Sequence, residues 1–423
     1  MRLQPTLIGL AASLTLLAAM PAQAQSKADF DAMREEIRQL REELNAMKKG
    51  QAAAAKPADA SGWGDRIEQL EIKSKDAVVL GDIGGGFRLP GSETSIRLYG
   101  YAEAHMIHDL KAWSGSDNFT DLGSQPASGE QGRTKLTAET SRFGFETATP
   151  TGAGSFNTKL EADFYSYASG NRNHLRLRHA YGEYAGFLVG QTWSTFMDLD
   201  DLPETVDFNG PIGSPFSRRT MIRYTYGDAK AGYKFTVALE DPQDQFGAGS
   251  ANERMPQVVA RYDQSFDWGA VNLRGLAHEK RSQSQSKRGY GLGVGGSFKL
   301  TDKDLLMGQY TAVDGDVDQL YGSNGYAIDG NGAITFDKNQ GLVVGYAKTF
   351  NDQLRGTVAF GMNQGKTAQA VDNKRLQQWF VNVIYSPIKN VELGGELVLG
   401  ERQTFSGEKG VMQRIDLMGR YSF

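Results

Sequence analysis

The feature that most constrains the fold is a series of segments, from Ser95 to the C-terminus, in which apolar and polar residues alternate. In the segment 156–164, apolar side chains take one face of a strand, and Lys159, Glu161 and Asp163 take the other. A shift of one residue would move these charges to the apolar face, so the strand register is well specified. Each segment has the roughly ten residues that a tilted strand needs to cross a bilayer. We therefore expect an all-β transmembrane barrel, with lipid outside and a polar interior.

The connections between these segments alternate in length. The short connections are 149–154, 227–230, 301–304, 351–352 and 386–390, and the long ones are 108–133, 192–217, 241–255, 314–339, 365–373 and 403–410. Short periplasmic turns and longer outer loops are typical of outer-membrane barrels. The pattern predicts about 16 antiparallel strands with both chain ends in the periplasm, and a barrel of that size leaves an aqueous channel.

The N-terminus has the order of residues that is typical of a secretory signal peptide. Arg2 precedes an apolar run over 7–19, and the small-residue sequence Ala22-Gln23-Ala24 follows. We expect residues 1–24 to be a signal peptide, with cleavage after Ala24. The apolar run is shorter than the roughly 20 residues of a membrane-spanning helix. No other stretch is apolar for long enough, and the mean hydropathy is −0.46, so a helical membrane protein is excluded but a barrel is not.

Composition narrows the function classes. The chain has no cysteine, so an exported form would hold together without disulfides. Its formal net charge is −4, and removal of Arg2 with the signal peptide makes it one unit more negative. This balance gives no bulk attraction to nucleic acid, so any preference for anions must come from local charge placement. The 51 glycines and plentiful aromatic residues fit a barrel with closely packed strands and aromatic girdles.

Residues 25–49 predict a coiled-coil helix. Apolar residues fall at heptad positions a and d, namely Phe30, Met33, Ile37, Leu40, Leu44 and Met47. The g positions are acidic and the e positions five residues later are basic, which favours a parallel, in-register assembly of identical chains. These six apolar residues would then carry oligomerisation. The alternative is an ordinary amphipathic helix that packs on its own domain.

Residues 50–94 predict a linker and a periplasmic stem. The segment 50–60 is rich in Ala, Lys and Pro, and offers no nearby domain on which the preceding helix could pack. A second apolar group, Ile67, Leu70 and Ile72, extends the stem, and the segment 81–91 is rich in turn residues. The barrel would occupy residues 95–423.

The connection that begins at Trp193 is unusually apolar and aromatic for an outer loop. Its acidic residues are Asp198, Asp200, Asp201, Glu204 and Asp207. Because a loop of this content is not expected to stay in solvent, we expect it to fold inward and to form a constriction with these acids at or near it. The alternative is a solvated acidic loop.

Six arginines are candidates for the basic wall of a pore. They are Arg176, Arg178, Arg219, Arg223, Arg261 and Arg274, and those on the fourth and sixth strands alternate with apolar residues. Arginine is costly on a lipid-facing surface, so these side chains are expected to point into the lumen. Basic residues facing an acidic loop would create a transverse field and ion selectivity. In the alternative interpretation these charges only neutralise one another.

Enzymatic interpretations have little support. The segment 291–296 contains G-x-G-x-x-G, but residues 297–300 continue a strand where a dinucleotide site needs a helix. His105 and His108 lie three apart on a strand, so they face opposite sides and cannot share a metal. We expect no metal and no cofactor. A Ser–His pair of a barrel phospholipase stays open, because such residues need only meet in space, although no nucleophile elbow is present.

Several motifs resemble known proteins. The sequences Ser141-Arg142-Phe143-Gly144-Phe145-Glu146 and Gly190-Gln191-Thr192-Trp193 resemble those of general bacterial porins. The N-terminal coiled coil, the loop sequence 203–211 and Arg223-Tyr224 are similar to the DcaP-like porin family. The resemblance covers most of the mature chain. It implies a homotrimer of 16-stranded barrels, each with its own pore, and a preference for small anionic solutes such as dicarboxylates.

The sequence thus predicts an outer-membrane porin with an N-terminal periplasmic coiled-coil helix, in contact with outer-membrane lipid. Small hydrophilic solutes, in particular organic acids, would diffuse through it passively. One alternative is a structural envelope tether in which the coiled coil matters and the barrel is an anchor. Another is a barrel enzyme such as a phospholipase.

Overall fold

The computed structural model describes residues 35–36, 38–39, 41–42, 79–111, 119–124, 132–166, 173–228, 232–242, 253–366 and 372–423. The six residues between 35 and 42 are helical, and Arg38 lies 2.6 Å from Glu35 and 2.7 Å from Glu42. The predicted signal peptide, the six apolar coiled-coil residues and the linker 50–78 lie outside these described residues. Within the described ranges, no helix has the length and apolar content needed to cross a membrane.

The main sheet of the described chain has three short strands and sixteen long antiparallel ones. They are β3 (Ser95–Lys111), β5 (Arg142–Thr151), β6 (Gly154–Asp163), β7 (Arg176–Tyr184), β8 (Phe187–Trp193), β9 (Arg218–Asp228), β10 (Tyr233–Glu240), β11 (Gln257–Phe266), β12 (Gly269–Arg281), β13 (Ser286–Thr301), β14 (Asp304–Asp314), β17 (Lys338–Asn351), β18 (Leu354–Gly365), β19 (Asn373–Tyr385), β20 (Val391–Thr404) and β21 (Lys409–Ser422). The short elements are β1 (Val79–Leu80), β2 (Phe87–Arg88), η1 (Leu122–Ser124), β4 (Arg133–Thr137), β15 (Tyr326–Ile328) and β16 (Ile334–Phe336).

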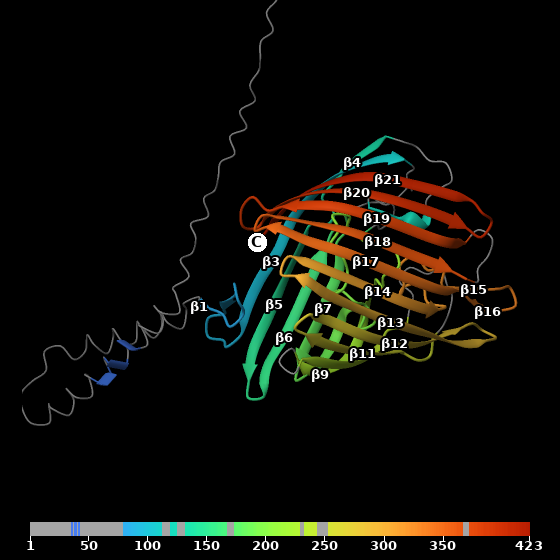
Figure 1. Ribbon diagram of the computed structural model, residues 1–423. Helices are drawn as coiled ribbons and strands as arrows, with labels where there is room; N and C mark the ends of the chain where they lie inside the picture. The colour runs from blue at the N-terminus through green and yellow to red at the C-terminus, as the bar shows by residue number, and fades with distance from the viewer. Residues whose placement is uncertain are drawn as a thin grey trace, which may run out of the picture. The chain divides into compact units, whose positions relative to one another are not determined.

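The sheet closes on itself through its first and last long strands. β21 pairs with β3, with Leu417 opposite Met106, and the red C-terminal strands lie next to the blue and cyan strands in Figure 1. The terminal residue takes part, because Phe423 and Gly100 exchange both backbone hydrogen bonds, at 3.0 and 3.2 Å. A side chain at Gly100 would lie 2.7 Å from the Phe423 ring. The predicted barrel of about 16 strands is confirmed.

The segment before the barrel forms a small strand pair of its own. β1 pairs with β2, and β2 pairs with the first residues of β3. Arg88 binds Asp82 at 2.8 Å, and the Ser95 hydroxyl accepts the backbone N–H of Asp82. The turn residues predicted over 81–91 therefore connect two very short strands.

The faces of the strands follow the predicted alternation. On β6 and just after it, Phe156, Leu160 and Phe164 are exposed, whereas Glu161 and Asp163 are buried. The exposed apolar side chains lie on the outside of the closed sheet, where lipid is the expected solvent. At one end of the barrel the strands join by tight turns, and at the other end most connections are long. The connection 282–285 is an exception, because it is short but lies at the loop end.

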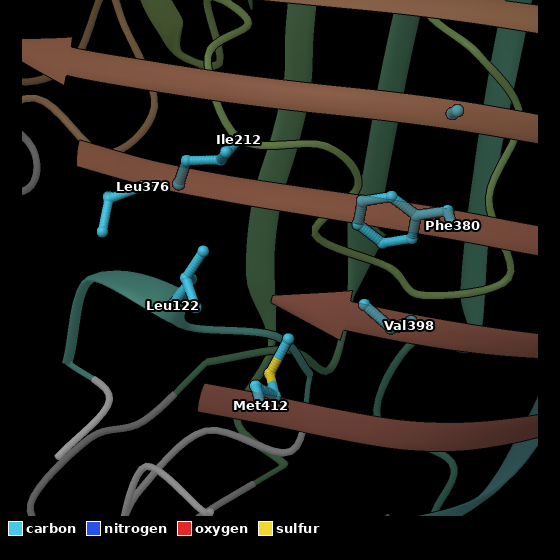
Figure 2. Close-up of a cluster of buried hydrophobic side chains, with 7 residues drawn as sticks. Leu122, Ile212, Leu376, Phe380, Val398 and Met412 are labelled. Carbon is cyan, nitrogen blue, oxygen red and sulfur yellow. The ribbon is translucent and has the colours of Figure 1, made fainter. Parts of the chain in front are cut away.

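The connection 194–217, which we call the inner loop, packs against the inside of the barrel. Ile212 of this loop joins a buried apolar cluster with Leu122 of η1 and with Leu376, Phe380, Val398 and Met412 of β19–β21, as Figure 2 shows. Phe196 joins a second cluster with Val259 and Leu276 of β11 and β12. The apolar residues that made this loop unusual are therefore the residues that pack against the wall.

Glycines on the wall make room for the inner loop. A Cβ atom built on Gly341 of β17 would lie 2.1 Å from the carbonyl oxygen of Gly213, and one on Gly361 of β18 would lie 2.4 Å from that of Ile212. Gly213 itself has φ +89°, a conformation that favours glycine. Gly295, within the G-x-G-x-x-G sequence, similarly leaves space for the Asp198 carboxylate. The glycine-rich sequence 291–296 therefore provides space in which the inner loop packs against the wall.

The assignment of the lipid-facing side of the strands predicts how substitutions there change the stability of the barrel. Val381 lies in the middle of β19 and is exposed, and its replacement by arginine puts a charge near the middle of the bilayer. We expect Val381→Arg to lower the free energy of unfolding in lipid vesicles by about 2–4 kcal/mol, and Tyr385→Arg, at the last residue of the strand, by about 0–1 kcal/mol. Equal costs at the two positions in denaturant titrations would contradict this assignment of the lipid face.

The glycines that leave space for the inner loop give a second prediction. Gly341→Ala forces the inner loop away from β17, and overpacking of this kind costs about 1–3 kcal/mol. Gly275→Ala on β12 is the matched control, because a Cβ there meets nothing within 4 Å. Denaturant unfolding should separate the two variants, and an unchanged midpoint for Gly341→Ala would show that the loop is not seated there.

Candidate functional site

The first half of the inner loop is bound to β11 and β12 through its acids. The Asn272 amide donates to Asp198 at 2.7 Å and to Asp201 at 2.8 Å, and all three side chains are buried. Arg261 and Arg274 lie 3.5 and 3.7 Å from the Asp198 carboxylate. Burial and the adjacent Asp198 carboxylate raise the pKa of Asp201 to about 7. Asp198 and Asp201 therefore form a close carboxyl pair in which a proton relieves the repulsion.

The acids of the second half bind elsewhere. Glu204 forms a two-pronged ion pair with Arg355 of β18, with both contacts at 2.8 Å. Asp207 is buried and accepts the backbone N–H and the hydroxyl of Thr120, at 2.9 and 3.0 Å. Burial raises the pKa of Asp207 to about 6, although Arg414 opposes the shift from 3.6 Å. Asp200 and Glu204 are the exposed members of the predicted acids, with side chains that are 77% and 43% exposed.

The six predicted arginines fall into separate groups. Arg261 and Arg274 touch the inner loop directly, and Arg274 also donates to the Phe196 carbonyl at 2.9 Å. Arg219 is fully buried and binds Asp318, in the connection after β14, at 2.8 Å. Arg223 is half-buried on β9, opposite Leu188 and Ala238.

Arg176 and Arg178 belong to a third group, on β5–β9, which we call the arginine cluster together with Arg142 and Arg218. Arg176 binds Asp163 at 2.7 Å, and Arg178 binds both Asp163 at 2.8 Å and Glu161 at 2.7 Å. Arg142 lies 3.5 Å from Glu161. These paired contacts hold the guanidinium groups close together in spite of their mutual repulsion.

Aromatic rings separate and orient the cluster. Arg218 stacks on the Trp193 ring at 4.1 Å, and Arg178 lies 5.6 Å from the same ring. Arg176 lies 4.7 Å from the Tyr165 ring and 5.7 Å from Phe208 of the inner loop. Cation–π contacts of this kind stabilise guanidinium groups without neutralising them.

A β-bulge on β7 builds part of this cluster. Glu161 pairs with His179 and Ala162 pairs with Leu177, so Arg178 is an extra residue between them. The bulge lets two consecutive side chains, Arg178 and His179, both be buried while Leu177 stays exposed. Simple alternation would have placed only one of them on that side.

Sequence reasoning missed several residues of this region. Arg142 lies on β5 within the sequence that resembles porins, and Arg218 directly precedes a predicted arginine. Glu240 and Glu396, which are buried on β10 and β20, bind the backbone of the inner loop. Strand alternation could have placed the two glutamates inside the barrel, but no local signal indicates that they meet a loop.

Metal and histidine chemistry find no support in the part of the chain that the structure describes. No group of three His, Cys, Asp or Glu residues there could hold a metal ion. His105 is buried between Glu103 at 3.2 Å and Asp416 at 2.9 Å, whereas His108 contacts Thr134. The site consists of fixed guanidinium groups, carboxylates and aromatic rings, which can attract and sort charged solutes.

Comparisons with known proteins agree with this architecture. The model of the DcaP outer membrane protein family matches residues 88–423. The crystal structure of the outer membrane channel DcaP of Acinetobacter baumannii is 30% identical, covers 80% of this chain and 99% of its own, and has a TM-score of 0.74. Porin Omp2b of Brucella canis is 25% identical over 300 residues, which is 67% of this chain and 77% of Omp2b.

A more distant structure shares the fold alone. The anion-selective porin from Comamonas acidovorans is 14% identical, with a TM-score of 0.53 over 78% of this chain and all of its own. The family match extends over the whole barrel, and the related proteins are porins without enzymatic activity. The chain is therefore an outer-membrane porin that belongs to the DcaP outer membrane protein family.

Proposed function

We propose that this porin lets small anionic solutes, in particular organic acids such as dicarboxylates, diffuse past the arginine cluster. The observation that carries the proposal is the sharing of two carboxylates, Glu161 and Asp163, by three guanidinium groups. Arg142, Arg176 and Arg178 thus bring one more positive charge than these two carboxylates neutralise, and Arg218 stacks on the Trp193 ring. A carboxylate solute would complete the charge balance with bidentate hydrogen bonds.

The overall acidity of the chain does not oppose this selectivity. Charges that line a narrow passage act on a solute at short range, whereas surface charges are screened over about 10 Å at 0.1 M salt. Many acids of the inner loop are already bound to the wall, as Asp198 is by Asn272 and Glu204 by Arg355. The local excess of guanidinium groups is therefore expected to decide the sign of the selectivity.

The inner loop is proposed to set the size limit. Its hydrogen bonds reach the inside of β10, β19 and β20, and the arginine cluster of β5–β9 would face it across the passage. Phe208 lies at this boundary, because its ring contacts both Arg176 and Arg178. Solutes would pass between the loop and the cluster.

The assembly is proposed to be a homotrimer. The support is membership of the porin family, together with the heptad pattern of residues 30–47 and its complementary charges at e and g. A coiled coil of under three heptads is marginal alone, and three tethered barrels would lower its association cost. The stem and coiled coil would then lie in the periplasm.

Ion selectivity in planar bilayers tests the role of the cluster. Arg142→Gln and Arg176→Gln should each lower the anion-to-cation permeability ratio, seen as a shift of the reversal potential under a salt gradient, and dicarboxylates should block the current less. Arg375→Gln is the control, because Arg375 is partly exposed and paired with Glu401 at 3.7 Å. Clear cation selectivity that persists in both cluster variants would overturn the proposal.

The Asp198–Asp201 pair predicts a pH dependence of loop docking. The pKa of Asp201 rises from its ordinary 3.8 to about 7, so between these values the folded chain binds more protons than the unfolded chain. Stability from this group is therefore present at low pH and lost as the pH rises through about 7. Asp201→Asn should remove this loss, whereas Asp200→Asn, at an exposed carboxylate, should keep it. Protease cleavage of the inner loop between about pH 5 and 8 measures the difference.

A further inference from the structure

Two wall carboxylates bind the inner loop through its backbone. Glu240 of β10 accepts the Thr195 N–H and the Ser194 hydroxyl, both at 2.7 Å. Glu396 of β20 accepts the N–H groups of Val206 and Asp207 at 2.9 and 2.8 Å. Each carboxylate thus holds two donors of the loop, one with each oxygen.

Neither carboxylate forms an ion pair within the described residues. Within the described chain, no Lys, Arg or His nitrogen forms an ion pair with Glu240 or Glu396, and both side chains are buried. Burial of an unpaired carboxylate is costly unless hydrogen bonds satisfy its oxygens. The donors of the inner loop, together with the Asn382 amide at 2.9 Å from Glu396, supply those bonds.

The two carboxylates lie on opposite sides of the barrel. β10 and β20 are eight strands apart in either direction around the ring of sixteen. The loop therefore begins against one side and is held again, eleven residues later, against the opposite side. Release at either point would free a different part of the loop.

Other wall side chains form hydrogen bonds with the loop backbone between Thr195 and Val206. Arg274 donates to the Phe196 carbonyl, Gln309 to that of Asp198 and Asn382 to that of Glu204, at 2.9, 3.1 and 2.9 Å. These backbone contacts add to the side-chain contacts by which Asn272 and Arg355 hold Asp198 and Glu204 of the loop.

We propose that Glu240 and Glu396 are positioning residues that set the aperture of the pore by clamping the inner loop at opposite sides of the barrel. The inference rests on the proposed function only in taking the inner loop as the size limit. It does not depend on the sign of the ion selectivity. The two carboxylates act on the solute through the loop and do not touch it.

The hydrogen-bond partners of Glu240 and Glu396 predict which of the two substitutions has the larger effect. All three partners of Glu396 are N–H donors, so Glu396→Gln replaces an acceptor oxygen by an amide N–H that faces another donor. At Glu240 one partner is the Ser194 hydroxyl, which can accept as well as donate a hydrogen bond. We therefore expect Glu396→Gln to loosen the loop more than Glu240→Gln.

The test uses the full-length porin in planar bilayers and in liposomes, with neutral sugars of graded size as probes. Glu396→Gln should raise the single-channel conductance and the size of the largest sugar that enters, and Glu240→Gln should do so less. Glu401→Gln, at a partly exposed carboxylate of β20 that pairs with Arg375, should leave both quantities at the wild-type level. If each variant unfolds at the same denaturant concentration as the wild-type protein, the barrel is intact and the change is confined to the loop.

The proposal is overturned if a correctly folded Glu396→Gln variant keeps the conductance and the sugar size limit of the wild-type protein. A wild-type channel that prefers cations would instead count against the proposed anion selectivity and leave the clamp standing. Hydrogen exchange of the wild-type protein provides a measurement that needs no variant. The amides of Thr195, Val206 and Asp207 should exchange as slowly as strand amides, and rapid exchange at these three positions would also overturn the proposal.

Discussion

The pairing of β21 with β3 is the interaction on which the rest of the structure depends. In a bilayer no water reaches the backbone, so an open sheet would leave a row of unpaired N–H and C=O groups in hydrocarbon. The hydrogen bonds between Phe423 and Gly100 complete this seam at the last residue of the chain. Closure creates an inside, and only then does the alternation of side chains separate a lipid face from a polar lumen.

The inside of the barrel is partly filled by its own loops. The apolar clusters around Ile212 and Phe196 give the inner loop a packed core, which most solvent-facing loops lack. The loop runs beside the strands without joining the sheet, so its N–H groups have no neighbouring strand to bind. Wall side chains such as Glu396 and Gln378 accept these hydrogen bonds instead. Glycines such as Gly341 and Gly361 supply the space.

The arginines inside the barrel have two roles, to hold the inner loop and, in the proposed function, to attract the solute. Arg261 and Arg274 stabilise the docked loop, where burial makes their contacts with Asp198 strong and their loss costly. The arginine cluster lies on the other arc of the wall, where guanidinium groups outnumber the carboxylates that hold them. An acidic chain can therefore present a locally basic surface to a solute, because distance and screening limit the effect of the remaining charges.

Period-two alternation alone predicted the barrel, its approximate strand number and the faces of its strands, because it is a local property that a closed sheet preserves. The sequence also indicated that the loop beginning at Trp193 would leave solvent, from its apolar content. The heptads of the N-terminal segment remain a prediction from sequence. Which charges meet became evident only in the folded chain. The bulge at Arg178, the burial of Arg219 against Asp318 and the grip of Glu240 and Glu396 on the inner loop join residues that lie far apart along the chain or break the local alternation. Such contacts depend on the closure of the sheet and the course of a loop within it, and no local pattern encodes either.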